Sequence, residues 1–400
     1  MPDMPTGQLI RLYRIDRKKS TVNVATHAGI TARYLEMIEA GTKTPSLPVL
    51  RKIAKVLGVR TSALIGEAPS EDHEGQVNPR LAEIERALFT YPSFVLSGRE
   101  VEPELSDAAA RIEAAGDAWF TSSDAYTEVL SVLADLIVDT ERLVHESGRS
   151  PESCTQAYKL YRLARGVLKH AGRIDLGTML ADRTMRYAEE SEDPLTIAAA
   201  TWTVGQAILS DDMPHGALDV AMMGAEKLEP LLPDGTPELF SIYGALIQCS
   251  AIAATRNGDP YRARELLRGP ASKAAQRVGD GKNYHHMFFG PTNVGIHTVA
   301  VEVEAGDISD AVRLADTVDI NKVASLERRC AFLYHVARAY DHKGNDTAVL
   351  VHLKMAEKLR PQDFLYKRDV RSMVSTLAKR ARPSYAAEVR EFASRIGLLN

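Results

Sequence analysis

From about Ser106 to its end, the chain carries apolar residues at the spacing of an α-helix. No segment alternates apolar and polar residues over the length of a β-strand. The helical stretches are separated by Gly, Pro or Asn, the residues that most often stop a helix. Helices are expected over 123–147, 153–170, 174–190, 195–210, 214–229, 237–256, 260–278, 292–305, 308–318, 324–342, 346–359, 366–381 and 384–396. The pattern therefore predicts an all-α fold.

Several of these helices form pairs that share a glycine turn. Gly258, Gly306 and Gly344 each follow a longer helix and precede one rich in Ala and Leu, at spacings of 48 and 38 residues. A helical hairpin cannot bury its apolar face alone, so successive hairpins are expected to stack into an α-solenoid. The best-formed unit, residues 332–361, resembles a tetratricopeptide repeat (TPR). An irregular helical bundle is the alternative.

The N-terminal part of the chain contains two short helices joined by a tight turn, within Ser20–Gly41. Ser20 and Thr31 are the expected N-caps, and Gly29 is expected to end the first of the two helices. A further helix is expected before them, over residues 7–19. The apolar positions expected in this core are Leu9, Ile10, Tyr13, Ile15, Val22, Val24, Ala25, Leu35 and Ile38.

The second helix, from Thr31 onward, carries a small mixed set of side chains away from its apolar side. Such a helix suits the DNA major groove. Arg33 is the best candidate for a base contact, because Arg bound to guanine is the commonest specific pairing. Ala32 and Met37 are expected to meet thymine methyl groups, and Glu36 to accept from cytosine or exclude other bases. The preceding helix would place its start, at Ser20–Thr21, near a phosphate.

This region resembles the helix-turn-helix of the phage-repressor (Cro/XRE) family, and the resemblance covers roughly Gln8–Gly66. It continues into Pro45 and the stretch LPVLRKIAKVLGV, which is similar to the fourth and fifth helices of that family. The resemblance implies an internal ion pair between Arg14 and Glu39. The matching positions are Ala25, Gly29, Thr31, Tyr34, Leu35, Ile38, Glu39 and Gly41. The residues expected to contact DNA are Ser20, Thr21, Thr31, Ala32, Arg33, Tyr34, Glu36, Met37, Lys43 and Thr44; Thr21 departs from the Gln usual there.

The N-terminal part and the rest of the chain also differ in net charge. Residues 1–66 have eleven Lys and Arg against four Asp and Glu, a net charge of +7, while the remainder has 38 basic and 49 acidic residues, a net charge of −11. A basic head on an acidic body is expected when only the head meets phosphate. The acidic, apolar-poor stretch 66–80 is typical of a linker. We expect a DNA-binding domain over 1–66, a linker and connecting helix over 67–105, and a helical sensor and dimerisation domain over 106–400.

The body contains one segment suited to binding an effector, YHHMFFGPTNVGIH at 284–297. It interrupts the helical rhythm and combines aromatic, His and amide groups, a mixture that suits a small-molecule or peptide pocket. The alternative is that Phe288 and Phe289 are core and that Thr292 and Asn293 only cap a helix. Arg328–Arg329 and Tyr334–His335 could line the inner face of the next repeat. The residues expected to bind an effector are Tyr284, His285, Asn293, His297 and Arg329.

The sequence contains no phosphate loop, dinucleotide fingerprint, zinc-protease motif or nucleophile elbow, so we expect neither an enzyme nor a cofactor. No metal site is expected, because adjacent histidines such as His285 and His286 rarely ligate one ion together. Three widely separated cysteines favour a reducing compartment. No run approaches the ~20 apolar residues of a membrane span, so no membrane contact is expected.

A phage-repressor-like head followed by a repeat-like helical body resembles a class of actinobacterial transcription regulators. The resemblance implies a cytoplasmic, nucleoid-associated regulator that binds double-stranded DNA. One such head reads only a few base pairs, so we expect a homodimer. The size of the body indicates modulation by a small-molecule or peptide effector. The alternative is a DNA-tethered scaffold that recruits a protein partner without a small ligand.

Overall fold

The computed structural model describes residues 4–59, 61–64, 78–90 and 104–398. Every regular element in these residues is a helix, as predicted. We call α1–α5 the head and α6–α23 the body. The head helices are α1 (Thr6–Asp16), α2 (Thr21–Ala28), α3 (Ala32–Glu39), α4 (Leu47–Leu57) and α5 (Thr61–Leu64).

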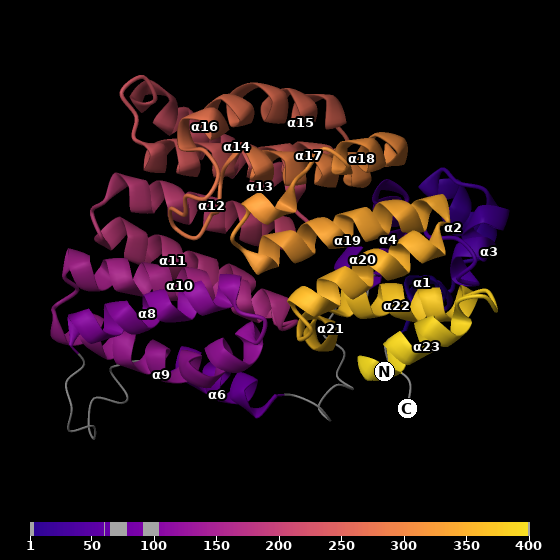
Figure 1. Ribbon diagram of the computed structural model, residues 1–400, viewed down its shortest axis with the longest axis horizontal. Helices are drawn as coiled ribbons and strands as arrows, with labels where there is room; N and C mark the ends of the chain where they lie inside the picture. The colour runs from indigo at the N-terminus through magenta and orange to yellow at the C-terminus, as the bar shows by residue number, and fades with distance from the viewer. Residues whose placement is uncertain (1–3, 60, 65–77, 91–103, 399–400) are drawn as a thin grey trace.

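The body is a continuous series of helices that pack mainly on their neighbours in sequence. Figure 1 shows it passing from α8 and α9 at the lower left, over α15 and α16 at the top, and back to α22 and α23 beside the head. Its helices are α6 (Pro79–Leu88), α8 (Leu105–Thr121), α9 (Ala125–Glu146), α10 (Pro151–His170), α11 (Gly177–Glu190), α12 (Pro194–Ser210), α13 (Pro214–Leu228), α14 (Pro237–Arg256), α15 (Pro260–Leu266), α16 (Ser272–Val278), α17 (Pro291–Ala305), α18 (Ile308–Ala315), α19 (Leu326–Lys343), α20 (Asp346–Leu359), α21 (Asp363–Tyr366), α22 (Arg368–Arg380) and α23 (Ala386–Arg395).

The predicted helix boundaries are mostly confirmed, because they depend on local signals. The glycine turns after α14, α17 and α19 lie where the spacing placed them. The expected single helix over 260–278 is wrong. It is interrupted by a π-turn at Leu267–Ala271 that contains Pro270. Proline has no N–H to donate and its ring clashes with the preceding turn, so the regular ladder cannot pass through it.

The head has the predicted caps. Ser20 Oγ accepts from the N–H of Asn23 at 3.1 Å, and Thr31 Oγ1 accepts from the N–H of Tyr34 at 3.2 Å. Gly29 ends α2 with φ of 69°, a conformation in which a Cβ would be strained. The Arg14–Glu39 ion pair implied by the resemblance is present and bidentate, at 2.6 and 2.7 Å.

Two apolar positions expected in the head core are instead exposed, Ile15 at 57% and Val22 at 63%. Val24 lies two residues after Val22, which turns it by more than half of the helix circumference away from Val22. The face that packs inward is therefore Val24, Ala25 and Ala28.

The first helices of the body contact its late α20–α21 turn, more than 230 residues away. The hydroxyl of Tyr126 donates to Asp363 Oδ1 at 3.1 Å, and the Tyr126 ring stacks on Tyr366 with centroids 4.3 Å apart. Arg360 lies over the Trp119 ring and donates to its carbonyl oxygen at 3.2 Å. The body is therefore closed on itself, whereas the solenoid pattern by itself predicts only a succession of stacked hairpins.

Helix α14 packs against α12, α13, α15, α16 and α17. Among the described residues it is the one helix long and apolar enough to cross a membrane, with a mean hydropathy of 1.3 over its most apolar window. The expectation that no segment is long and apolar enough to span a membrane is therefore wrong. However, 89% of that window is buried inside the protein, so α14 is a core helix surrounded by others.

Replacing Gly7 by Ala is expected to destabilise the head. An added Cβ would overlap the backbone carbonyl oxygen of Ile38, so α1 and α3 would have to separate. Overpacking of this kind costs about 1–3 kcal/mol. The free energy of unfolding in urea measures the effect. The matched control is Gly166→Ala in α10, where nothing lies within 4 Å of the added carbon, and it should be neutral or stabilising. Equal effects of the two substitutions would contradict this packing.

Candidate nucleic-acid interface and central cavity

The side of α3 opposite its core residues is open to solvent. Leu35 and Ile38 are buried, while Arg33 and Glu36 are exposed and Ala32 and Met37 are partly exposed. Figure 1 shows α2 and α3 at the outer edge of the molecule, away from α8–α11. The four predicted base-contacting residues therefore share an accessible helix face.

A shallow hollow at the start of α2 collects basic and polar side chains. It is lined by Lys18, Lys19, Ser20, Asn23, His27 and Val56. Lys19 Nζ donates to the carbonyl oxygen of Val56 at 2.5 Å, which holds this lysine against α4. Unpaired N–H groups at a helix start and adjacent lysines suit a phosphate oxygen.

The remaining predicted DNA contacts differ in their surroundings. Tyr34 packs partly against the head core, and burial raises its pKa. Lys43 is exposed. Thr44 faces the body, since its Oγ1 accepts from Arg380 Nη1 at 3.3 Å. The position of Thr44 thus contradicts its expected availability to DNA in this arrangement of head and body, because a long-range contact occupies the side chain.

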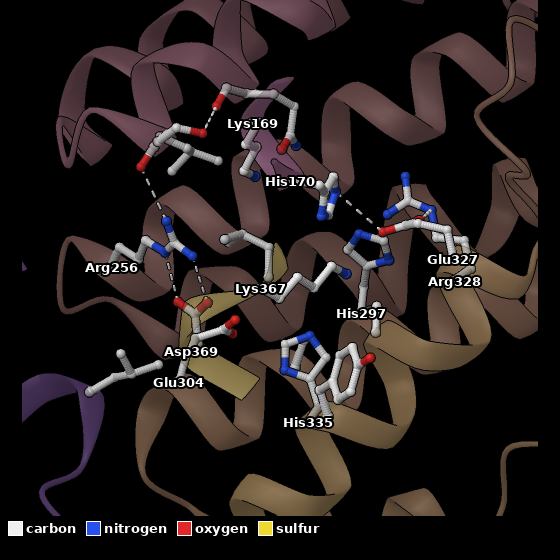
Figure 2. Close-up of a pocket in the computed structure, with 18 of the residues that line it drawn as sticks. Lys169, His170, Arg256, His297, Glu304, Glu327, Arg328, His335, Lys367 and Asp369 are labelled. Atoms are coloured by element: carbon white, nitrogen blue, oxygen red, sulfur yellow. Dashed lines mark hydrogen bonds and ion pairs between the residues drawn. The ribbon is translucent and has the colours of Figure 1, made fainter. Parts of the chain in front are cut away.

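Head and body together line an open cavity of about 360 Å³. Its wall is built from α12, α14, α17 and α19, from the segment 366–369, and from Leu47, Arg51 and Thr61 of the head. Figure 2 shows ten of the charged and imidazole side chains pointing toward this common space. The cavity lining contains seven Lys and Arg against four Asp and Glu, so it carries a surplus of positive charge.

A buried carboxylate joins the two parts of the molecule at this cavity. Glu304 is 5% exposed and receives Arg256 of α14 at 2.8 and 2.9 Å and Arg51 of α4 at 3.0 Å. Burial alone would raise the pKa of Glu304, but Arg256 and Arg51 outweigh it and lower the pKa to about 2. We call Arg51, Arg256 and Glu304 the head–body ion cluster.

A second contact docks the start of α5. The N–H and Oγ1 of Thr61 both donate to Asp212 Oδ2, at 3.1 and 2.5 Å. Asp212 lies in the turn between α12 and α13. The head is therefore held against the inner side of the body at several points rather than only tethered to it.

Of the five residues predicted to bind an effector, the structure places only His297 in the cavity. Its Nδ1 lies 3.0 Å from the carbonyl oxygen of Asn293, which makes Nδ1 the protonated nitrogen. His285 instead bridges Tyr158 and Glu238, at 3.1 and 2.9 Å. Tyr284 packs against the body core.

The positions of the other two also contradict their expected role. Asn293 is 1% exposed and donates to the carbonyl oxygen of Phe288 at 2.7 Å, so it stabilises the turn before α17. Arg329 donates to the carbonyl oxygens of Val323 and Asn321, at 2.6 and 3.0 Å. Both side chains satisfy nearby backbone oxygens, a requirement that residue type alone does not reveal. Arg328, Tyr334 and His335, which were expected on an inner face, do line the cavity.

Sequence reasoning missed most of the wall, including Lys169, His170, Gln206, Gln248, Arg256 and Lys367. One signal was available. Within α19, Arg328, Ala331, His335 and Arg338 recur at helical spacing on a helix whose other sides are apolar. A polar stripe on an otherwise buried helix indicates a solvent-filled interior.

One group in the described residues brings three metal-ligating atoms within 4.8 Å of one another, from Glu113, Asp117 and His286. Both carboxylates are exposed, and the His286 ring stacks on Phe120. Exposed acidic groups often gather in this way without an ion, and the cluster lies outside the cavity.

The protein is expected to lose stability as the pH falls from 7.5 to 6, because the cavity histidines are held neutral. Burial and Arg328 lower the pKa of His297 to about 4, and burial and Arg338 lower that of His335 to about 3. In the unfolded chain these two histidines bind protons near pH 6.5, whereas in the folded chain they stay neutral at that pH. Their contribution to the free energy of unfolding is therefore fully present above pH 6.5 and falls below it. The loss is roughly 1 kcal/mol for each histidine.

Urea unfolding at the two pH values measures this loss. His297→Gln and His335→Gln should each reduce it. The matched control is His215→Gln, at an exposed side chain, which should leave it unchanged. A stability that does not depend on pH over this range would contradict neutral buried histidines.

The fold and the exposed α3 face define a DNA-binding helix-turn-helix head carried on a large helical body. A family described as Helix-turn-helix matches residues 10–64. The immunity repressor protein of Bacillus phage phi105 is 30% identical over 110 residues, which is 25% of this chain and 76% of the repressor. The transcriptional regulator SinR of Bacillus subtilis is 32% identical over 85 residues, 21% of this chain and 77% of SinR.

The chain belongs to the helix-turn-helix family of Cro/XRE-type repressors, and it is a DNA-binding transcriptional regulator. Two solved structures align with most of the chain at low sequence identity. Bacillus thuringiensis PlcR, in complex with the peptide PapR7 and DNA, covers 86% of this chain and 99% of its own at 11% identity, with a TM-score of 0.33. Apo ComR from S. thermophilus covers 79% of this chain and 95% of its own at 12% identity, with a TM-score of 0.24.

Proposed function

We propose that this regulator reads operator DNA through the exposed face of α3 and that an effector in the central cavity sets its DNA affinity. Arg33 contacts a base, Ala32 and Met37 meet thymine methyl groups, and Glu36 discriminates among bases. The start of α2 binds a phosphate next to Lys18. The exposure of these side chains on one face supports this assignment.

The proposal that an effector regulates DNA binding rests on one observation: residues of the head and of the body line the same cavity. Leu47, Arg51 and Thr61 of the head line the same space as α14, α17 and α19 of the body. An occupant that reaches Leu47, Arg51 or Thr61 contacts the head directly. A ligand shifts an equilibrium only by its difference in affinity for the two states, and an occupant that fits one head position better than another supplies such a difference.

The active species is proposed to be a homodimer, since one head reads only a few base pairs. Dimers of such domains usually bind two half-sites about 34 Å apart. Residues 1–66 form its DNA-binding domain, 67–105 a connection and 106–400 the sensor and dimerisation domain. The described part of the connection, α6, packs into the body core through Leu81, Ile84 and Leu88. Sedimentation as a monomer, both free and on operator DNA, would rule out the dimer.

The test begins with selection of bound sequences from random duplexes by the full-length protein. We expect one preferred sequence at moderate salt. The variant Ala331→Trp then fills the cavity with a permanent side chain, and it should change operator affinity by several-fold. The matched control is Ala110→Trp on the exposed face of α8, which should leave affinity unchanged. Absence of any sequence preference would overturn the regulator assignment, and equal behaviour of the two Trp variants would overturn regulation through the cavity.

A further inference from the structure

Positive charge in the cavity wall exceeds negative charge, and several of the cationic side chains are mostly buried, with Lys367 10% and Arg51 16% exposed. Several of the seven cations have definite partners. Arg51 and Arg256 share Glu304, and Arg338 lies 3.4 Å from Asp369. Lys367 Nζ lies 3.1 Å from Asp363 Oδ2, but the same carboxylate also compensates Arg360. A single carboxylate thus faces two buried cations.

Arg328 is only weakly compensated. Its Nε lies 3.6 Å from Glu327 Oε2, beyond hydrogen-bonding distance. Nε is buried and has no hydrogen-bond partner among the described residues. The Glu327 carboxylate is also shared, because His170 Nε2 approaches its other oxygen at 3.7 Å. The Arg328 side chain is 20% exposed, but a buried N–H donor without a partner costs free energy unless something else offsets it.

Two imidazoles line the same cavity, and His297 is close enough to Arg328 for the guanidinium charge to add to burial in lowering its pKa. His335 lies two turns after Arg328 on α19, and its Nδ1 is likewise buried without a partner in the described chain. His297 comes from α17, and since its Nδ1 is bonded to Asn293, its Nε2 remains to face a ligand. Figure 2 shows Arg328, His297, His335 and Lys367 around the same space. The four groups come from three segments of the chain, and the closed body brings them together.

We propose that this part of the cavity binds the anionic group of a small ligand, a carboxylate or a phosphate, between Arg328, His297, His335 and Lys367. The guanidinium offers a planar pair of donors that matches either oxyanion, and Lys367 adds a point charge. Either histidine donates a hydrogen bond once it takes up a proton beside the anion. The cavity volume of about 360 Å³ lies at the small end of ligand pockets and fits a small molecule. This assignment rests on the proposed effector function and names the chemistry of its ligand.

The experiment titrates the full-length protein with inorganic phosphate and, separately, with citrate, each against sodium chloride at matched ionic strength. Thermal unfolding and calorimetry report binding. We expect saturable stabilisation by at least one of the two anions, and the stronger of the two identifies the oxyanion class. No stabilisation beyond that of sodium chloride would overturn the site.

The variant Arg328→Gln removes the charge and should weaken anion binding by roughly 10–100-fold. The basic head also attracts phosphate. The affinity of the cavity site is therefore judged from the difference in anion binding between the wild type and this variant. Arg186→Gln on the exposed side of α11 is the matched control and should bind as the wild type does. Should Arg328→Gln fail to fold, His335→Gln leaves the Arg328–Glu327 pair in place and should still weaken binding. Equal anion affinity in the wild type and the cavity variant would overturn the assignment.

The anion site and the regulatory function can fail separately. If neither anion binds but Ala331→Trp still changes operator affinity, the cavity regulates and the anion chemistry is wrong. If an anion binds at Arg328 but operator affinity stays constant as it saturates, the site stands and regulation through it is wrong.

Discussion

Removal of the Glu304 carboxylate is expected to destabilise the protein by roughly 3–5 kcal/mol, the cost of leaving buried charges without their partner. Glu304→Ala deprives both Arg51 and Arg256 of their counter-charge, and the Glu304 side chain itself is only 5% exposed. The free energy of unfolding in urea measures the loss. Asp310→Ala, at an exposed surface pair with Arg313, is the matched control and should change stability by less than about 1 kcal/mol.

A second variant separates the head–body contact from the stability of the body. Arg51→Met breaks only the link to the head, because Glu304 keeps its two bonds to Arg256. It should cost less than Glu304→Ala and should raise hydrogen exchange in α4 more than in α14. A loss below 1 kcal/mol for Glu304→Ala, or unchanged exchange in α4 of Arg51→Met, would contradict the role given to the head–body ion cluster.

The second large effect is expected at the DNA-reading face. Arg33→Ala should weaken operator binding by about 1–3 kcal/mol, which is roughly 5–150-fold, and should relax discrimination at one base position. Stability should stay unchanged, because Arg33 is exposed. Binding to operator and to scrambled duplexes, measured by fluorescence anisotropy at fixed salt, gives both quantities.

Lys18→Ala provides the contrasting control for Arg33→Ala. Lys18 lies at the hollow beside the start of α2, where a phosphate contact carries no sequence information. Its removal should weaken binding to all duplexes alike and reduce the salt dependence. If Arg33→Ala lowered affinity for operator and scrambled DNA equally, α3 would not be the element that reads bases.

Much of the fold could be predicted because it depends on short-range chemistry. The caps at Ser20 and Thr31 and the turn at Gly29 are set by a few adjacent residues, and the structure has all three. Helix boundaries in the body follow from Gly and Pro for the same reason. The errors arose where one residue overrides a pattern, as Pro270 does within 260–278.

The two candidate sites differ in how far they could be predicted from the sequence. The α3 face could be assigned from the sequence because residues three and four apart on one helix share a side. The cavity could not, since its wall joins helices separated by more than a hundred residues and includes part of the head. The expectation that 284–297 binds an effector failed in most positions. Asn293 donates to a buried backbone oxygen, and His285 is hydrogen-bonded to Tyr158 and Glu238, so neither side chain faces the cavity.

The sequence by itself determined that this chain is helical, that its N-terminal part is a helix-turn-helix of the Cro/XRE type, and which side chains α3 exposes to solvent. These properties depend on residue spacing along one helix or across one turn. Only the tertiary structure decided that the body closes on itself and that the head docks on a positively charged cavity. That outcome depends on which distant charges meet, as Arg51 meets Glu304 across 253 positions, and no local pattern encodes it.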